Sequence, residues 1–249
     1  MEKEIPSEFY VRVFASLASS ASTLRFWSIG NLILQQALGQ LDPDRLGMAI
    51  TVARCMPPSR GQKVRSLRES TGLGTAPWAG DLEQKAMFLG AESLAGYVAT
   101  SCRPAVNQNI KDEPGLLPTH QVEGELSAAI YPILYGGRSA GCLLVSSAQP
   151  NHFHSQARLL LIQQYADLMA LAFEPEEFYE PRDIQLRIMP SQSVQKLYFA
   201  DFRQRVANTL RDSIGTDRPL DTIEAEQLVW QELEGELIEL SVALPVGER

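Results

Sequence analysis

The sequence predicts an α+β fold in which an antiparallel sheet is flanked by helices and followed by a C-terminal helical extension. Three observations lead to this prediction. Residues 128–135 and 139–147 read as two strands on either side of Gly136-Gly137, and paired glycines suit a tight hairpin because both accept positive φ. Residues 155–173 carry an apolar helical stripe that would cover one face of such a sheet. Beyond residue 173, only helical patterns of any length follow.

Two helices are expected before the first strand. Residues 11–21 are rich in Ala and Ser with apolar spacing, and Ser22 and Thr23 are suitable caps for a second helix. Asp42-Pro43-Asp44 ends that second helix, because proline cannot continue it. The N-terminal part of the chain is therefore expected to lie against the sheet as helices.

The first half of the sheet is expected to begin with a hairpin. Residues 48–55 and 63–69 alternate in apolar character and are separated by Pro and Gly. Residues 70–80 contain three glycines and Pro77, and we interpret them as a loop that carries Trp78. The remaining elements before the central hairpin are a strand over 85–89, a helix over 91–100 that Pro104 ends, a strand over 105–110 and a polar stretch over 111–125.

The C-terminal third differs from the rest of the sequence in composition and in its apolar pattern. Residues 174–183 are acidic and bounded by prolines, which is typical of a linker. Helices are predicted over 194–214 and 221–244, the second with an apolar heptad-like spacing. The expected organisation is an N-terminal helical segment over 1–23, a sensor-like domain over 24–173, a linker over 174–192 and a two-helix extension over 193–249.

The composition limits the kinds of partner that the protein is expected to bind and the cellular compartment in which it is expected to lie. A formal charge of −8 and a pI near 5.0 argue against general binding to nucleic acid or anionic lipid, since phosphates attract clustered Lys and Arg. The sequence has 3 cysteines without a Cys-x-x-Cys pair and 3 histidines, which favours neither a disulfide framework nor a structural zinc site. Without an apolar signal segment or a membrane-length apolar run, we expect a cytoplasmic protein that does not enter the membrane.

Over residues 24–173 the order of these elements resembles the GAF family, which is related to PAS domains. The most specific stretches are 90–104, where a glycine precedes a short helix and Pro104, and 127–153, which holds the glycine hairpin and ends at an aromatic. The resemblance implies a sheet with a cavity beneath the helix at 91–100 and the loop after it. It also implies a non-catalytic sensory or regulatory protein that binds a small molecule, a protein partner or both.

Candidate ligand-binding positions follow from the elements that line the cavity in this family. They are Trp78, Val98, Asn109, His120, Ser127, Ala129 and Tyr131. The alternative at each position is ordinary core or loop packing. The identity of any ligand or cofactor is not specified by these residues.

Several known subtypes of the family are disfavoured. The Asn-Lys-Phe-Asp-Glu motif of cyclic-nucleotide-binding members is absent, and neither Cys102 nor Cys142 is followed by the histidine that often accompanies covalent pigments. His120 lies in the loop region in which an axial haem ligand would be placed, although an exposed loop histidine is the simpler interpretation. The free methionine sulfoxide reductases use loop cysteines of depressed pKa, and the cysteine spacing here does not match. Hydrolase and phosphate-loop motifs are also absent.

Two helices carry apolar seams that suit a partner. The residues concerned are Leu24, Trp27, Asn31, Leu34 and Leu38 in the first seam and Trp230, Leu233, Leu237 and Leu240 in the second. Heptad-like spacing of this kind indicates a homodimer or a protein partner. The alternative is that both helices pack on their own sheet.

Three functional hypotheses remain open. The first is a sensor that binds a small molecule or a partner in signal transduction. The second is a scaffold whose cavity is filled by its own side chains and which only mediates protein contacts or dimerisation. The third is a thiol-based redox sensor or an enzyme that resembles a methionine sulfoxide reductase.

Overall fold

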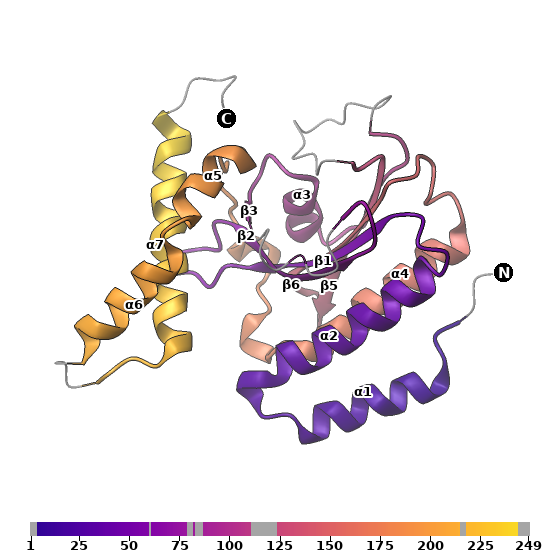
Figure 1. The fold of residues 1–249 in the computed structure, drawn as a ribbon, viewed down its shortest axis with the longest axis horizontal. Coiled ribbons are helices and arrows are strands. Elements are labelled where there is room, and N and C mark those ends of the chain that lie inside the picture. The colour runs from indigo at the N-terminus through magenta and orange to yellow at the C-terminus, as the bar shows by residue number, and fades with distance from the viewer. Residues whose placement is uncertain are drawn as a thin grey trace.

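Six strands form one antiparallel sheet in the order β3-β2-β1-β6-β5-β4, and helices cover both of its faces (Figure 1). The computed structural model describes residues 4–59, 61–78, 82, 87–110, 124–214 and 218–243. The strands are β1 Met48–Cys55, β2 Leu67–Gly74, β3 Phe88–Leu89, β4 Ala105–Asn107, β5 Ser127–Tyr135 and β6 Arg138–Ser147. The helices are α1 Ser7–Ser19, α2 Ser22–Leu41, α3 Leu94–Ser101, α4 Gln156–Met169, α5 Gln192–Phe199, α6 Phe202–Ser213 and α7 Thr222–Ala243. The predicted α+β class is confirmed.

The central hairpin forms where the glycine pair predicts it. Tyr135 pairs with Arg138, so Gly136 and Gly137 alone make the turn, with φ values of 58° and 77°. Both angles lie in the region that side chains with a Cβ rarely adopt, which is why glycine is needed twice. This hairpin places β5 beside β6 at the centre of the sheet.

Strand β2 corrects the loop expected over residues 70–80. It continues to Gly74, with Gly72 paired to Thr51 and Gly74 paired to Ala49 of β1. A Cβ on Gly72 would lie 2.8 Å from the Thr51 hydroxyl oxygen and 3.0 Å from the Ile50 carbonyl oxygen. The glycine here permits close approach of two strands, whereas the sequence pattern alone reads it as a turn signal.

The two faces of the sheet have separate cores. Helices α2 and α4 pack on one face, with α1 on the outer side of α2, and Ile33, Tyr165 and Leu143 belong to a single buried cluster there. Helix α3 packs on the other face, where Val98 and Cys142 belong to a second cluster. Because side chains alternate along a strand, the central strands β1, β5 and β6 contribute to both cores. A part of the second face beside the start of α3 is hollow and holds the pocket described below.

Residues 174–192, expected to be a linker, lie packed along the protein. Two 3₁₀ turns, Pro175–Glu177 and Pro181–Asp183, precede a stretch that runs beside the chain before β2. There the amide of Gln185 donates to the carbonyl of Val64 at 2.8 Å, and the amide of Arg187 donates to that of Arg65 at 2.7 Å. These backbone bonds attach the segment to the sheet domain, which a solvated linker would not require.

The C-terminal helices form a third cluster against the edge of the sheet at β3 (Figure 1). The single helix predicted over 194–214 is two helices, α5 and α6, separated at Ala200 and Asp201. The break lets Phe199 reach Phe88 of β3, with ring centroids 5.9 Å apart, while Phe202 stacks on Trp230 at 4.2 Å. Helix α7 completes the cluster.

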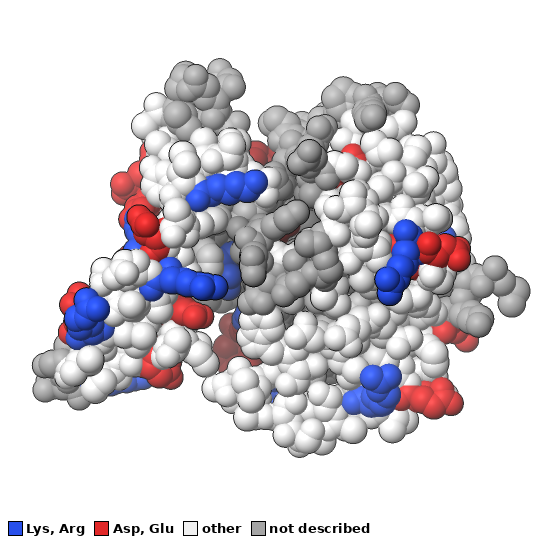
Figure 2. Space-filling view, in the orientation of Figure 1, with Lys and Arg blue, Asp and Glu red and all other residues white. Residues whose placement is uncertain are grey.

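Charged residues join these elements. Glu234 of α7, only 3% exposed, accepts hydrogen bonds from Arg65 and from the Ser66 hydroxyl, both at 2.6 Å. Arg205 of α6 pairs with Glu236 of α7 at 2.6 Å. Figure 2 shows Lys and Arg interspersed with Asp and Glu over α6 and α7. Within the described residues, no helix has the length and apolarity to cross a membrane.

Candidate ligand-binding pocket

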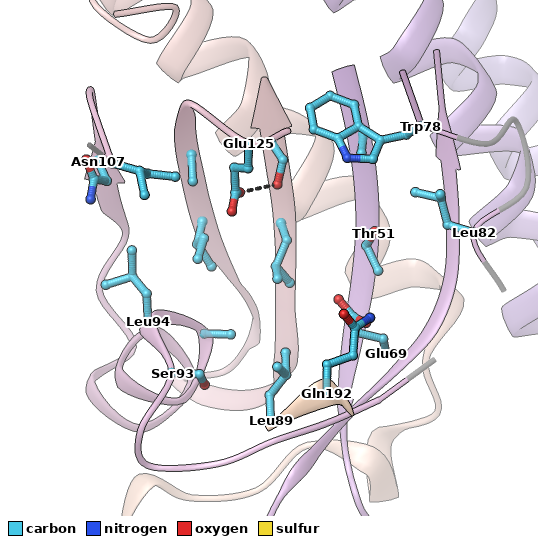
Figure 3. A pocket seen from close by; sticks show the side chains of 17 residues that line it. Thr51, Glu69, Trp78, Leu82, Leu89, Ser93, Leu94, Asn107, Glu125 and Gln192 are labelled. Carbon is cyan, nitrogen blue, oxygen red and sulfur yellow. Dashed lines mark hydrogen bonds between the residues drawn. The ribbon is translucent and has the colours of Figure 1, made fainter. Parts of the chain in front are cut away.

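A pocket of about 100 Å³ lies between the sheet and the start of α3 (Figure 3). The strands contribute its floor, and the N-terminal turn of α3 and the residues near Trp78 and Gln192 contribute its walls. Its apolar lining is Ala49, Trp78, Leu82, Leu89, Leu94, Ala95, Ile110, Ala128, Ile130 and Leu144. Its polar lining is Thr51, Glu69, Ser93, Asn107, Glu125, Ser146 and Gln192. A largely apolar concavity with a few polar groups is the usual form of a small-molecule site.

The turn that leads into α3 is held by a serine cap and two close backbone contacts. The Ser93 hydroxyl accepts from the amide of Gly96 at 2.9 Å and donates to the carbonyl of Gly90 at 2.8 Å. A Cβ on Gly96 would lie 2.1 Å from the Gly90 carbonyl oxygen, and one on Gly90 would lie 2.0 Å from that of Arg187. Only glycine fits at either position, so this wall of the pocket is fixed in place.

Two glutamates face the pocket from different elements. Glu69 lies on β2, and Glu125 lies just before β5, where its carboxylate accepts a hydrogen bond from the Ser146 hydroxyl at 2.5 Å (Figure 3). Burial, followed by the charge of Glu125, raises the pKa of Glu69 from 4.5 to about 8. A carboxyl group in this setting holds a proton at neutral pH unless a positive charge arrives beside it.

One wall of the pocket comes from beyond the sheet domain. Gln192, the first residue of α5, lines the pocket close to Glu69 (Figure 3). One turn later, the buried Gln195 side chain accepts from the amide of Phe88 at 2.8 Å and donates to the carbonyl of Phe88 at 2.9 Å. In β3, the next residue, Leu89, lines the pocket itself. The C-terminal extension is thus in direct contact with the site.

Of the six sequence-predicted ligand residues that the structure describes, Trp78 alone is in the lining. Val98 is fully buried inside the second core, and the Ser127 hydroxyl donates to the carbonyl of Gln149 at 2.7 Å. Asn109 follows β4, and its amide donates to the side chain of Asn107, which does line the pocket. His120 lies outside the described residues.

The expected positions of Ala129 and Tyr131 are corrected by the alternation of β5. Both belong to the core beneath α2 and α4, while their neighbours Ala128 and Ile130 line the pocket. A shift of one residue moves a strand side chain to the other face of the sheet, and β5 is apolar on both faces. Nothing in the sequence of this strand therefore distinguishes the pocket side.

Glu69, Glu125 and Gln192 line the pocket but were not predicted, and the sequence marks them as site residues to different degrees. Glu69 is a charged residue at the end of an apolar strand pattern, a placement that could have marked it as a site residue. Glu125 stands close before a continuous apolar strand and offers a weaker form of the same signal. Gln192 has none, because its contact with the pocket depends on how the following helices dock.

Most residues of the two apolar seams predicted to contact a partner are instead buried or partly buried within this chain. Leu34, Leu233 and Leu237 are fully buried in the protein's own cores. Partial burial is found for Asn31, Leu38, Trp230 and Leu240. Leu24 and Trp27 remain 56% and 39% exposed, so any contact with a second copy or another protein through the first seam would involve these two. That contact stays a prediction.

None of the three cysteines lines the pocket. Cys55 and Cys142 are buried beneath α3, and burial raises the pKa of Cys55 to about 12 and that of Cys142 well above its ordinary value. Cys102 is half-buried at the end of α3, and burial raises its pKa as well. Thiol chemistry requires the thiolate, which all three environments disfavour.

Comparison with known proteins gives one sequence family and several distant structures. A family model described as GAF domain matches residues 29–174. The GAF domain of an Acinetobacter phosphoenolpyruvate-protein phosphotransferase is 19% identical, with 66% of this chain and 90% of that chain covered and a TM-score of 0.42.

Two further solved structures are similar at the same distant level. The GAF domain of A. aeolicus nlh2 in an inactive state is 15% identical over 67% of this chain and 93% of that chain, with a TM-score of 0.45. The free methionine-R-sulfoxide reductase of Neisseria meningitidis in complex with its substrate is 11% identical over 70% and 96%, with a TM-score of 0.43. No curated protein matches the chain.

Proposed function

Because the chain belongs to the GAF domain family, we propose that it is a non-catalytic sensor that binds a small molecule in the pocket beside α3 and reports its occupancy through α5, α6 and α7. Membership of this family supports a sensory or regulatory role in general. The choice of a small molecule, the site and the route of the signal are the parts that we add.

The observation that carries the proposal is the position of Gln192. This residue, the last of the segment expected to be a linker, is the first residue of α5 and also lines the pocket. A ligand there would touch the sheet, α3 and α5 at once, so its differential contacts could favour one placement of α5 over another. In a pocket closed by the sheet domain alone, the extension would have no direct means of sensing the ligand.

A continuous set of contacts supports the route of the signal. Gln195 of α5 is bonded to the backbone of Phe88, whose ring lies 5.9 Å from Phe199 and 5.8 Å from Trp230 of α7. The neighbouring residue of β2, Arg68, lies over the Trp230 ring at 4.4 Å, while Glu69 lines the pocket. On β2 and β3, Glu69 and Leu89 thus line the pocket, while the residues just before them, Arg68 and Phe88, contact Trp230 of α7.

The two alternative functions receive less support. A scaffold with a filled cavity would leave no room beside α3, where a pocket of about 100 Å³ is found. A redox sensor or reductase would place a thiol of depressed pKa at the pocket, whereas the pKa of each cysteine is raised and none lines it.

The test is a ligand screen followed by a coupling measurement. Thermal denaturation of the full chain with amino acids, amines, organic acids and nucleotides should reveal at least one compound that raises Tm. Ala128→Leu, which fills the pocket floor, should abolish the rise, while Ala18→Leu on exposed α1 should leave it unchanged. A screen without any response would refute ligand binding.

Hydrogen exchange then tests the route. With the best compound bound, amides of α5 should gain protection in the wild type and gain less in Gln192→Ala, even where the two proteins bind equally. Equal protection in both proteins would contradict transmission through Gln192. The pocket would then remain a binding site without the proposed output.

A further inference from the structure

The charge that lines the pocket is of one sign. Among the lining residues in the described part of the chain, Glu69 and Glu125 are the charged ones, and Lys, Arg and His do not occur. The Glu125 carboxylate is engaged by the Ser146 hydroxyl, but none of the hydrogen bonds or ion pairs formed between described residues involves the Glu69 carboxylate. Burial of a carboxyl group away from a compensating charge is costly, which makes Glu69 the group most in need of a partner.

The rest of the lining suits an apolar body with one charged end. Leu89, Leu94, Ile130 and Leu144 are among the lining residues. Trp78 lies at the end of the space opposite Leu89 (Figure 3). An aromatic face attracts a cation as well as an apolar group. Carboxylate, aromatic ring and aliphatic wall together are the surroundings that a small alkylammonium group would find favourable.

Resting on the function proposed above, we infer that the pocket selects a compact organic cation, a protonated amine with a short apolar body, and that Glu69 forms the ion pair with it. The size of the pocket sets the scale of the group that fits inside it, because a space of about 100 Å³ is smaller than a cavity that holds benzene, at about 150 Å³. Amines with about four or five carbon atoms are therefore the appropriate class.

Other charge classes fit less well. An anion would lie beside Glu69 and Glu125, and no cationic lining residue of the described chain would offset the repulsion. A metal ion needs several oxygen, nitrogen or sulfur ligands, and no group of three or more His, Cys, Asp or Glu side chains able to hold one occurs among the described residues. A neutral molecule would leave the Glu69 carboxyl group protonated and without an ionic partner.

The proposed ion pair makes the affinity for the amine depend on pH, because Glu69 must lose its proton to form it. In the unliganded protein the pKa of Glu69 is about 8, so at neutral pH the carboxyl group keeps its proton. Among the described residues, the titratable groups that interact electrostatically with Glu69 are Glu125, before β5, and the buried thiol of Cys142 on β6, and neither carries a positive charge. The arriving ammonium keeps its own proton, as that of lysine does, and Glu69 releases one proton to solvent. Binding should therefore strengthen as pH rises towards about 9.

The experiment compares three probes of one shape on the full-length chain, namely n-butylamine, 1-butanol and butyrate. Binding is followed by the indole N–H signal of Trp78 in two-dimensional NMR, with the signal of Trp27 on α2 as an internal reference away from the pocket and from the C-terminal helices. We expect butylammonium to bind about tenfold more tightly than 1-butanol and more tightly still than butyrate. Its affinity should rise about a hundredfold between about pH 6 and about pH 9, because the ionised fraction of a carboxyl group with a pKa of about 8 rises by that factor.

Glu69→Gln supplies the variant test, with the exposed Glu176→Gln as its matched control. The first should remove both the preference for butylammonium and its pH dependence, and the second should change neither. Equal or tighter binding of 1-butanol or butyrate to the wild type would overturn the inference, as would displacement of butylammonium by Ca²⁺ or Mg²⁺.

The failure of this inference can be distinguished from the failure of the proposed function. If no butyl probe binds but another compound of the thermal screen does, the cation selectivity is wrong and the sensor stands. If nothing binds in either experiment, both are wrong. The wild-type pH profile requires no variant, so the result does not depend on whether Glu69→Gln folds.

Discussion

Glu69 is the residue at which stability and the proposed function oppose each other. Its carboxyl group lies in a largely apolar site, and burial together with Glu125 raises its pKa from 4.5 to about 8. In the unfolded chain the same group loses its proton near its ordinary pKa. Between these two values the folded protein binds more protons than the unfolded chain, so the free energy of unfolding falls as pH rises.

Replacing Glu69 with Gln should remove that decline. We expect Glu69→Gln to be more stable than the wild type above about pH 8, by on the order of 4 kcal/mol, and to differ little from it near pH 4. Urea denaturation of both proteins across this range measures the difference. The exposed Glu176→Gln should follow the wild-type curve, and a Glu69→Gln curve parallel to that of the wild type would contradict the raised pKa.

The cysteines make a second prediction at the scale of single residues. Cys55 and Cys142 are buried with raised pKa values, whereas Cys102 is half-buried at the end of α3. A thiol reagent should therefore label one cysteine in the native protein and all 3 after denaturation. Cys102→Ser should leave the native protein unlabelled on the same timescale. Rapid native labelling of Cys55 or Cys142 would reopen the redox alternative.

At the scale of elements, α5 takes the place that a further strand would have beside β3. Its Gln195 side chain bonds both the amide and the carbonyl of Phe88, so one amide group satisfies backbone groups at this edge. Exposed strand edges favour unwanted pairing, and covering them with a helix is one of the ways in which proteins avoid it. The same cover brings Gln192 to the pocket, which ties the protection of the edge to the proposed output.

Helix α7 is fixed to the sheet domain by one buried carboxylate. Glu234→Ala would leave Ser66 and Arg65 without their acceptor, and we expect it to lower the free energy of unfolding by about 2 kcal/mol. The estimate is moderate because the Arg65 side chain is 26% exposed and can turn to water.

The matched control for this prediction is Glu239→Ala, an exposed change on the same helix, which should alter stability by less than about 0.5 kcal/mol. Urea denaturation near neutral pH measures both variants. Equal effects of Glu234→Ala and Glu239→Ala would mean that the buried contacts do not hold α7 in place.

At the scale of the whole molecule, the folded unit extends beyond the matched family region. Residues 29–174 contain the sheet and α3, but β3 and Met56 are buried against the C-terminal helices. Residues 184–187 add backbone hydrogen bonds to Val64 and Arg65. The extension is therefore part of the core that stabilises the sheet domain.

A chain that ends at residue 174 should show this dependence. Removal of α5, α6 and α7 would expose Phe88 and Met56, and two large apolar side chains correspond to about 3–6 kcal/mol. We expect a lower Tm than in the full chain together with binding of an apolar dye. A truncated chain as stable as the full one would support the independent domain and linker that the sequence predicts.

Much of the fold could be predicted because it depends on local patterns. The Gly136-Gly137 turn, the apolar stripe of α4 and the proline after α2 each act on their own neighbours, and each of these elements forms where it is expected. The residues of the pocket could be predicted less well from the sequence. Both faces of β5 are apolar, so the sequence cannot tell Ala128 from Ala129, and Gly72 reads as a turn until Thr51 is found beside it.

Residues 90–173, the stretch with the clearest family pattern, determined by themselves the class of fold and its resemblance to sensory domains, because helix and strand periodicity and turn chemistry are local properties. Only the tertiary structure decided which side of the sheet holds the pocket, that Glu69 and Glu125 face it together, and that Gln192 closes it. These contacts join residues that are distant along the chain, and distance in sequence carries no record of which side chains meet. The physical reason is packing, since each helix takes the position that buries its apolar face, and the polar residues of the site follow from that choice.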